Sequence, residues 1–435
     1  FAPPSALVSA PGHFRQVATS HDSPPPRHLA LWLADAHASQ SGEVKEMCSR
    51  FVKGVSFTFF GNSLAYPQCG AYGLCADPSR GTTSLLRRLL ARPGDLEDIA
   101  AEFRELHWPA LARQVDVVVC SVPAIFCGLF DDVDRSVFGY LALPPLHGVP
   151  RGEAQRSWGA RFRAIVLDSR NVFACFNGYL AAAVAWQFGA SYRLPVVRLF
   201  GLHTRSAHIP WRRDEVLIAR HGKAQALQEC LLRRFVEGSG SSFPFRFVQF
   251  TDLLDNSNGT APPTRRYNMS LSFATLASFR AVVFWPNDVT LVMFYEMYTA
   301  CVPIFVPRYF WRHAHGQTTL SSAEGDAAER APAPSEFGSP FTARHFDAVD
   351  APFVLDAFAA AYWAQFSDFA SFPNVVRFVG IPDLMRMLVS MDLQEVSKNM
   401  RVFNLAQLAE ASAFWQAASN RLLELRIDAS RRGEG

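Results

Sequence analysis

The chain repeats one pattern, in which short apolar runs alternate with stretches of helical periodicity. The runs "HLALWLADAH" (28–37), "VDVVVCSVP" (115–123) and "SVFGYLALP" (136–144) have strand length and stop at polar or turn residues. Continuous apolar runs are typical of parallel strands that are buried on both faces, and the helical stretches supply the crossovers that parallel strands need. The sequence therefore predicts an α/β fold with a doubly wound parallel sheet over residues 28–202.

The same pattern restarts in the second half. "DEVLIARHGK" (214–223) indicates a strand and a loop, a helical stretch follows, and "FRFVQF" (245–250) indicates the next strand. The chain ends in a long amphipathic stretch at about 400–427. Because 435 residues are too many for one ordinary core, two or three domains are expected, and the restart of the pattern favours two. We predict two Rossmann-like domains that face a cleft, with a C-terminal helix crossing back to the first domain.

The expected boundaries follow from composition and from the restart of the pattern. They are a Pro-, Ser- and His-rich flexible lead-in (1–27), an N-terminal domain (28–202), a hinge (203–213), a C-terminal domain (214–398) with a disordered Ala-, Pro- and Ser-rich insertion (316–345), and a closing helix with a tail (399–435).

Charge and composition exclude several classes of protein. The net charge is +3 and the basic residues are scattered, so no dedicated nucleic-acid surface is expected. The most apolar run, 288–308, contains Glu296, Pro303 and Pro307 within the ~20 residues that a membrane span needs, so no span is expected. No Cys-x-x-Cys pair occurs and no cysteine pair is matched with histidines at zinc spacing, so a structural metal is not expected.

The cysteines leave the compartment open. Cys69 and Cys75, in a Gly- and Tyr-rich loop, can form a disulfide if the compartment is oxidising. Cys120, Cys175 and Cys301 lie in apolar runs and are expected to be buried thiols.

The glycosylation sequons and the N-terminus do not decide the cellular compartment. Two sequons, at Asn258 and Asn268, argue weakly for secretion, so the secretory pathway and the cytoplasm both remain. The chain begins at Phe1 without methionine, so we expect a segment before it.

Glu296 stands alone in the apolar run "DVTLVMFYEMYTACVPIFVP". An ionised carboxylate is costly to bury without a partner, so it either faces solvent or is paired. Asp288 follows Pro286-Asn287 and is expected to cap the helix, which would place Glu296 two turns further on, roughly 12 Å along the axis. Ligands bind at the carboxyl ends of parallel strands, and a carboxylate there can accept hydrogen bonds from both hydroxyls of a ribose. We therefore interpret Glu296 as paired by a ligand.

The block "YEMYTACVPIFVP" (295–307) resembles the glutamate-containing helix of GT-B glycosyltransferases. Many members of the retaining branch also carry an acidic residue eight positions earlier, which is Asp288 here. The chain departs from that pattern at Cys301, where glycine is usual, and at "WPND", which replaces a Gly-rich turn. The arrangement also resembles an uncharacterised GT-B-like family of protists and animals. The resemblance implies a nucleotide-sugar donor, with Glu296 and Asn287 as donor contacts and Asp288 as a catalytic candidate.

A donor diphosphate needs positive charge or free N–H groups. "VLIARHGK" ends an expected strand with Arg220, His221, Gly222 and Lys223. In GT-B enzymes an Arg and a nearby Lys often follow the first strand of the C-terminal domain, so the resemblance implies that Arg220 and Lys223 neutralise the phosphates. The alternative is a pair of solvated loop cations.

The N-terminal domain is expected to supply the acceptor side and, in inverting enzymes, a general base. "LADAH" ends the first strand with Asp35 and His37, which are the catalytic candidates there. The alternative is a plain loop histidine. Asn177-Gly178, at a strand-to-helix turn, is a candidate anion contact of a kind that is common in α/β domains.

Two classes of function remain. The first is a glycosyltransferase that moves a sugar from a nucleotide-sugar to an unknown glycan, protein or lipid acceptor. It is expected to use no metal and no other cofactor, since GT-B enzymes usually neutralise the leaving diphosphate with side chains and a helix N-terminus, and Arg220 and Lys223 are available here. The second is a non-catalytic GT-B-like module that binds a sugar or a protein. A sugar-nucleotide epimerase of the same fold would be expected to cluster several acids and histidines, and a Rossmann dehydrogenase is disfavoured because no strand precedes Gly-x-Gly-x-x-Gly.

Overall fold

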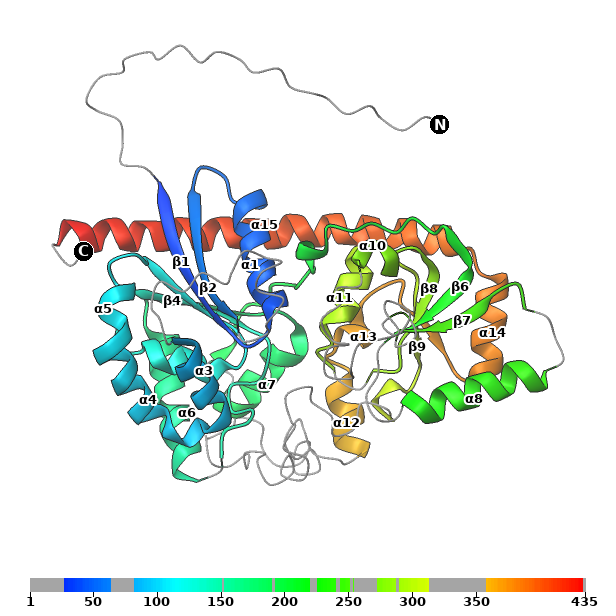
Figure 1. Cartoon of the computed structure of the whole chain (residues 1–435), viewed down its shortest axis with the longest axis horizontal. Helices are drawn as coiled ribbons and strands as arrows, with labels where there is room; N and C mark the ends of the chain where they lie inside the picture. Colours follow the sequence, from blue (N-terminus) through cyan, green and yellow to red (C-terminus); the bar gives the residue numbers. More distant parts are fainter. Residues whose placement is uncertain are drawn as a thin grey trace, which may run out of the picture.

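The structure is a computed structural model that describes residues 27–63, 82–150, 152–189, 192–219, 225–239, 243–250, 253, 272–286, 289–312 and 357–432. These residues form two α/β domains side by side, with one long helix running along both (Figure 1).

The N-terminal domain contains a parallel sheet of five strands in the order β2-β1-β3-β4-β5. The strands are β1 (His28–Asp35), β2 (Ser56–Ser63), β3 (Val117–Cys120), β4 (Ser136–Leu141) and β5 (Val172–Cys175). The inner strands β1 and β3 are buried almost throughout, as their continuous apolar runs predict. The expected strand "PVVRLF" makes a single bridge, Cys175 to Val196.

The helices of this domain are α1 (Ala38–Phe51), α3 (Thr82–Ala91), α4 (Leu96–Glu102), α5 (Trp108–Leu111), α6 (Glu153–Leu167) and α7 (Gly178–Phe188). The helix expected at 95–114 is divided by a π-helical turn, Phe103–His107. Pro109 is the second residue after that turn and has no N–H to continue the ladder of helical hydrogen bonds, which accounts for the irregularity.

The C-terminal domain repeats the plan with five parallel strands in the order β10-β9-β8-β6-β7. The strands are β6 (Arg212–Ile218), β7 (Arg246–Gln249), β8 (Phe279–Val283), β9 (Ile304–Pro307) and β10 (Val376–Phe378). The helices are α8 (Gln225–Gly238), α10 (Phe273–Leu276), α11 (Val292–Thr299), α12 (Ala357–Ala364), α13 (Asp368–Ser371) and α14 (Ile381–Ser390). Strand β10 was not predicted, because three residues are too few to show a pattern.

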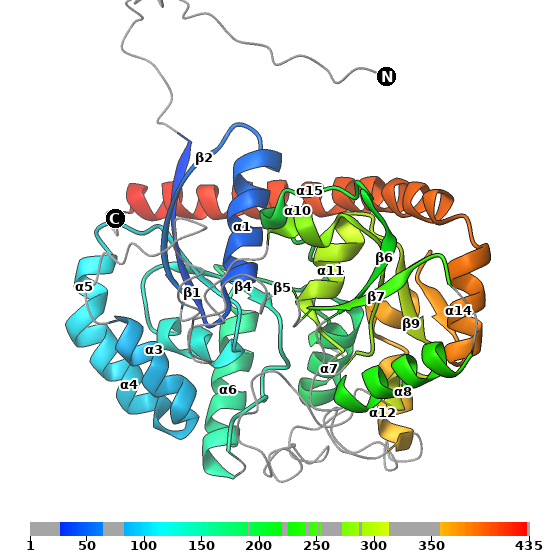
Figure 2. The same ribbon diagram turned by 45° about the vertical axis from the view of Figure 1, so that its right-hand side comes forward.

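Helix α15 (Leu393–Arg431) lies along both domains (Figures 1 and 2). It begins earlier than expected, because the Asp392 side chain accepts hydrogen bonds from the backbone N–H groups of Gln394 and Glu395 and caps it. In the N-terminal domain, Trp415 packs edge-on against Phe138 and Tyr140 of β4. The two-sheet fold and the crossing helix that the sequence predicts are confirmed.

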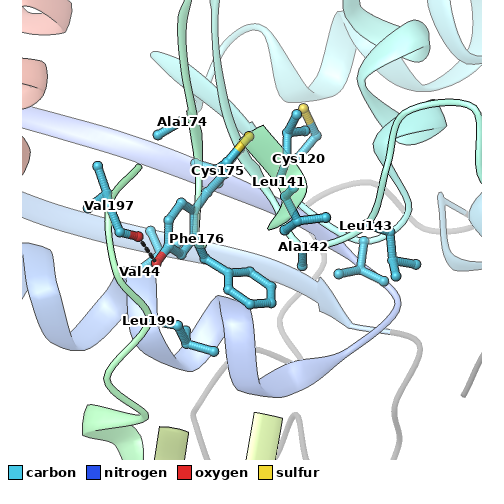
Figure 3. Close-up of a cluster of buried hydrophobic side chains, with 14 of the residues drawn as sticks. Val44, Cys120, Leu141, Ala142, Leu143, Ala174, Cys175, Phe176, Val197 and Leu199 are labelled. Atoms are coloured by element: carbon cyan, nitrogen blue, oxygen red, sulfur yellow. Dashed lines mark hydrogen bonds between the residues drawn. The ribbon is translucent and has the colours of Figure 1, made fainter. Parts of the chain in front are cut away.

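The core is continuous from one domain to the other. Buried apolar residues of the N-terminal sheet, α11, α13 and α15 belong to one cluster, and a smaller cluster lies within the C-terminal domain. Figure 3 shows part of the first cluster, where four apolar side chains come together. They are Leu141 of β4, Phe176 directly after β5, Val44 of α1 and Leu199 of the segment after α7. An interdomain contact this apolar is a packed core, which favours a fixed arrangement of the domains.

One cysteine prediction is wrong. Cys120 is not a thiol but is bonded to Cys127, and both residues are fully buried. The error arose because the two lie seven residues apart, and only the turn after β3 brings them together. Cys175 and Cys301 are buried and free, as expected.

Several predictions lie outside the described residues. They are the lead-in up to residue 26, the Cys69–Cys75 pair and the insertion 316–345. Within the described part of the chain, no helix has the length and apolar character to cross a membrane.

Candidate functional site at the domain junction

Helix α11 carries Glu296 and begins later than the sequence predicts. Its first residue is Val292 and its N-cap is Leu291, so Asp288 does not cap it. The prediction was wrong because β-branched and apolar residues follow the aspartate, and the helix starts only after a turn. Glu296 is the fifth residue of α11 and lies about 6 Å along its axis, one turn in rather than two.

The Glu296 side chain is buried, and it has a partner within the chain. His203, in the 3-10 helix η5 (Leu202–Thr204), is hydrogen-bonded through Nε2 to Glu296 Oε1 at 3.0 Å. The two residues are 93 positions apart. His203 belongs to the interdomain linker, which runs from Val197, after the bridge at Val196, to Trp211, before β6, and Glu296 belongs to the C-terminal domain. The neighbours of Glu296 in the sequence are apolar and offer it no partner, but in the fold His203 supplies one.

Gly201 lets the linker backbone lie directly against α11. Its φ is +67°, which favours glycine, and a Cβ added there would lie 2.8 Å from Glu296 Cγ and 3.0 Å from Glu296 Cα. Any larger residue would displace either the linker or the helix. The position of Glu296 thus depends on a glycine in the linker.

Helix α1 holds the linker from the other side. The Glu43 carboxylate, which is buried, accepts hydrogen bonds from the backbone N–H groups of Phe200 at 2.8 Å and Leu202 at 2.7 Å. Burial raises the pKa of Glu43, although the charge of His203 and these two hydrogen bonds oppose the shift. The linker is thus fixed between α1 and α11, and we call the region around Glu43, Gly201, His203 and Glu296 the domain junction.

The protonation of His203 depends on its acidic neighbours. Burial alone would lower the pKa of this imidazole, but the hydrogen bond and charge of Glu296, together with the charges of Glu43 and Glu46, outweigh burial and raise it. The raised pKa favours the imidazolium near neutral pH, where it forms an ion pair with Glu296.

A second set of polar residues, Asn177, Tyr295 and Asp368, joins the two domains next to Glu296. Asn177 caps α7 by accepting a hydrogen bond from Leu180 N, and its Nδ2 donates to the Tyr295 hydroxyl of α11 at 2.9 Å. Burial raises the pKa of Asp368 to about 6, while its hydrogen bond with Tyr295 and the charge of Arg198 oppose this. The amide that was predicted as an anion contact is thus engaged in the cap and the interdomain hydrogen bond.

Arg198 places a buried cation among aromatic rings. Its guanidinium carbon lies 4.5 Å from the ring centre of Phe200, 4.6 Å from Phe372 and 4.9 Å from Tyr298. Burial lowers its pKa to about 10, which still leaves it charged at neutral pH. These cation–π contacts stabilise the charge where water is excluded, and they tie the linker to the C-terminal domain.

The predicted pair Asp35 and His37 lies at the carboxyl end of β1. The buried Asp35 carboxylate accepts hydrogen bonds from His37 N at 2.8 Å, Ser41 N at 3.1 Å and Ser41 Oγ at 2.9 Å. The imidazole of His37 caps α1 by accepting a hydrogen bond from Ser39 N at 3.4 Å. Asp35 therefore shapes the turn between β1 and α1, and His37, which is half-buried, is the more accessible of the two.

Asp35 should make stability depend on pH. Burial raises its pKa from 3.8 to about 7, although hydrogen bonds from the surrounding backbone and from Ser41 oppose the shift. A raised folded-state pKa stabilises the fold fully below pH 4, and this contribution is lost as the pH rises towards 7. The amide of Asp35→Asn does not ionise, so we expect its free energy of unfolding to gain on wild type between these values, by up to about 1.4 kcal/mol per pH unit. Urea unfolding from pH 4 to 8 measures this.

Asp168→Asn is the matched control. A hydrogen bond from Arg170 lowers the pKa of Asp168. The contribution of Asp168 to the stability of the fold is therefore lost as the pH falls rather than as it rises. If the free energy of unfolding of Asp35→Asn and of wild type changed in parallel from pH 4 to 8, ionising Asp35 would not destabilise the folded protein, and the prediction would be wrong.

The other predicted site residues, Arg220, Lys223, Asn287 and Asp288, lie outside the described residues. Among the residues that are described, no group of three His, Cys, Asp or Glu is placed to hold a metal ion. Sequence reasoning did not single out Glu43, Arg198, His203 or Asp368. The available signal was their charge next to apolar residues in the linker and the flanking helices, which is weak without the fold.

No family model and no curated protein matches the chain. Among solved structures it is similar to the glycotransferase of kitacinnamycin, with 13% identity over 92% of this chain and 100% of that chain and a TM-score of 0.47. It is also similar to the glycosyltransferase SnogD from Streptomyces nogalater (14%, 90% and 99%, TM-score 0.41). A third is SsfS6 from Streptomyces sp. SF2575, complexed with thymidine diphosphate (8%, 91% and 99%, TM-score 0.42). Likenesses this distant assign no site residue and no reaction to this chain.

Proposed function

We propose that the protein is a nucleotide-sugar-dependent glycosyltransferase whose donor binds at the domain junction through Glu296. The observation that carries the proposal is a buried carboxylate between two Rossmann-like domains, held through one oxygen by the linker residue His203. Its other oxygen, Oε2, accepts no hydrogen bond from the residues that the structure describes. A carboxylate held in this way suits the vicinal hydroxyls of a ribose, which donate hydrogen bonds to it.

The order of the strands in the C-terminal sheet suggests where the donor phosphates bind. Strands β6 and β8 are parallel neighbours, so the chain leaves both at the same edge of the sheet. Arg220 and Lys223 follow β6 in the sequence, and Asn287 and Asp288 follow β8. We propose that the two cations neutralise the diphosphate and that Asn287 contacts the donor.

The acceptor side belongs to the N-terminal domain in this proposal. Asp35, His37 and Asp288 are the candidates for the catalytic step. Because Asp35 is buried and accepts three hydrogen bonds, we assign it the positioning of the turn and His37 the proton transfer. The acceptor is a glycan, a protein or a lipid.

A nucleotide panel tests the proposal. UDP, GDP, CMP, thymidine diphosphate and their sugar conjugates are added to the purified protein, and the melting temperature is recorded with and without EDTA. We expect one base to raise the melting temperature, because binding to the folded state stabilises it by about 2.7 kcal/mol at a concentration of 100 Kd. The rise should survive EDTA, since side-chain cations and not a metal neutralise the phosphates. A rise that EDTA abolishes and Mn²⁺ restores would contradict the metal-free donor site.

Two observations favour a second function, a non-catalytic module with the same fold. The domains share a continuous apolar core, and the Asp35 and Glu43 carboxylates are already engaged by the protein. Such a module would show no turnover of any nucleotide sugar in the panel. Release of free nucleotide from a bound nucleotide sugar would exclude it.

A further inference from the structure

We propose that His203 is a positioning residue for the donor nucleotide: it holds one oxygen of Glu296 and thereby leaves the other free to bind the ribose diol. This inference rests on the proposed function and adds a residue that the sequence did not suggest. His203 itself need not touch the nucleotide, because it acts through the carboxylate.

The geometry keeps the imidazole in place. Its side chain is 1% exposed, and the ring packs edge-on against Phe273 of α10, with 5.8 Å between the ring centres. The backbone on either side is held by α1, because the N–H groups of Phe200 and Leu202 donate to Glu43. A side chain anchored at both its ring and its backbone gives the Glu296 carboxylate one fixed donor.

The charges around the imidazole favour its protonated form. Among the described residues, the carboxylates whose charge acts on it are Glu296 of α11 and Glu43 and Glu46 of α1. The positive charges nearby belong to Arg205, which donates to Glu46 at 2.6 Å, and to Arg198, whose charge acts on Glu43. Three carboxylates thus surround one imidazole.

A protonated His203 has two effects on Glu296. Its N–H donates to Oε1 and fixes the rotamer, and its positive charge strengthens that hydrogen bond. Both effects reduce the loss of conformational entropy that fixing the carboxylate would cost when a diol binds to Oε2. When the pH rises above the folded-state pKa of His203, the charge is lost and the nucleotide should bind more weakly.

The variants separate these two effects. The amide introduced by His203→Gln can still donate a hydrogen bond but cannot be charged. The nucleotide affinity of this variant should therefore lack the pH-dependent change that the His203 charge causes in wild type. His203→Ala removes the donor as well, and we expect its Kd to rise about tenfold or more at every pH. His208→Gln is the matched control, because His208 is a linker histidine bonded to Phe279 O and Ser397 and not to Glu296. It should follow wild type.

The experiment is calorimetric titration of each variant with UDP, GDP, CMP and thymidine diphosphate. Each Kd is divided by that of wild type at the same pH, which cancels the ionisation of the nucleotide itself. Glu296→Gln is titrated in parallel. If it weakens binding while both His203 variants keep the wild-type affinity and pH profile, the positioning role is wrong and the donor site stands. If Glu296→Gln binds as wild type does, or if no nucleotide binds at all, the donor site fails and the role of His203 fails with it.

Discussion

Glu296→Gln should lower both the stability and the nucleotide affinity of the protein. The amide nearly matches the carboxylate in shape, but it leaves the buried His203 without its negative partner. We expect the free energy of unfolding to fall by about 1.5–3 kcal/mol, the value for hydrogen bonds to charged groups. This is less than the ~3–5 kcal/mol for breaking a buried ion pair, because the imidazole can release its proton. Melting temperature and urea unfolding measure the loss.

The nucleotide affinity of the same variant decides what Glu296 does. If the carboxylate binds the ribose, the binding free energy should weaken by roughly 1.5–3 kcal/mol as well. Reduced stability with unchanged affinity would leave Glu296 as a structural partner of His203 and end the donor-site proposal. Glu424→Gln, on the exposed side of α15, is the control and should change neither quantity by more than about 0.5 kcal/mol.

Trp415→Ala should cause the largest loss of stability in the molecule's closing helix. The indole is 2% exposed, with ring centres 4.9 Å from Phe138 and 5.5 Å from Tyr140. Removing it opens a cavity between α15 and β4, and we expect a cost of about 3–5 kcal/mol in the free energy of unfolding. Chemical denaturation followed by circular dichroism measures this cost.

The control for this helix is Val402→Ala, because Val402 is 63% exposed on α15. Truncating it should change the free energy of unfolding by no more than about 0.5 kcal/mol. If Trp415→Ala unfolds like Val402→Ala, the C-terminal half of α15 does not hold the N-terminal domain. The arrangement of the two domains would then depend on the domain junction.

The local periodicity of the sequence was enough to predict the two sheets. The run "VVVC" (117–120) is apolar throughout because β3 is covered on both faces, and that burial can be recognised without knowing what covers it. The end of the chain likewise showed its helical period, and α15 forms there. Where an element is three residues long, as β10 is, or interrupted by Pro109, the pattern is too short or too mixed to place its limits.

The partners within the candidate site were decided by tertiary structure. The sequence showed that Glu296 needs a partner, but His203 is 93 residues away, and only the docking of the linker between α1 and α11 brings the two together. Asp35 was placed at the right strand end, yet its burial in the fold raises its pKa, and Ser41 and the backbone of the following turn occupy its oxygens. The reason is physical: periodicity records which side of an element is buried, whereas the energy of a buried charge depends on the few atoms that contact it, and the chain brings those atoms from both domains.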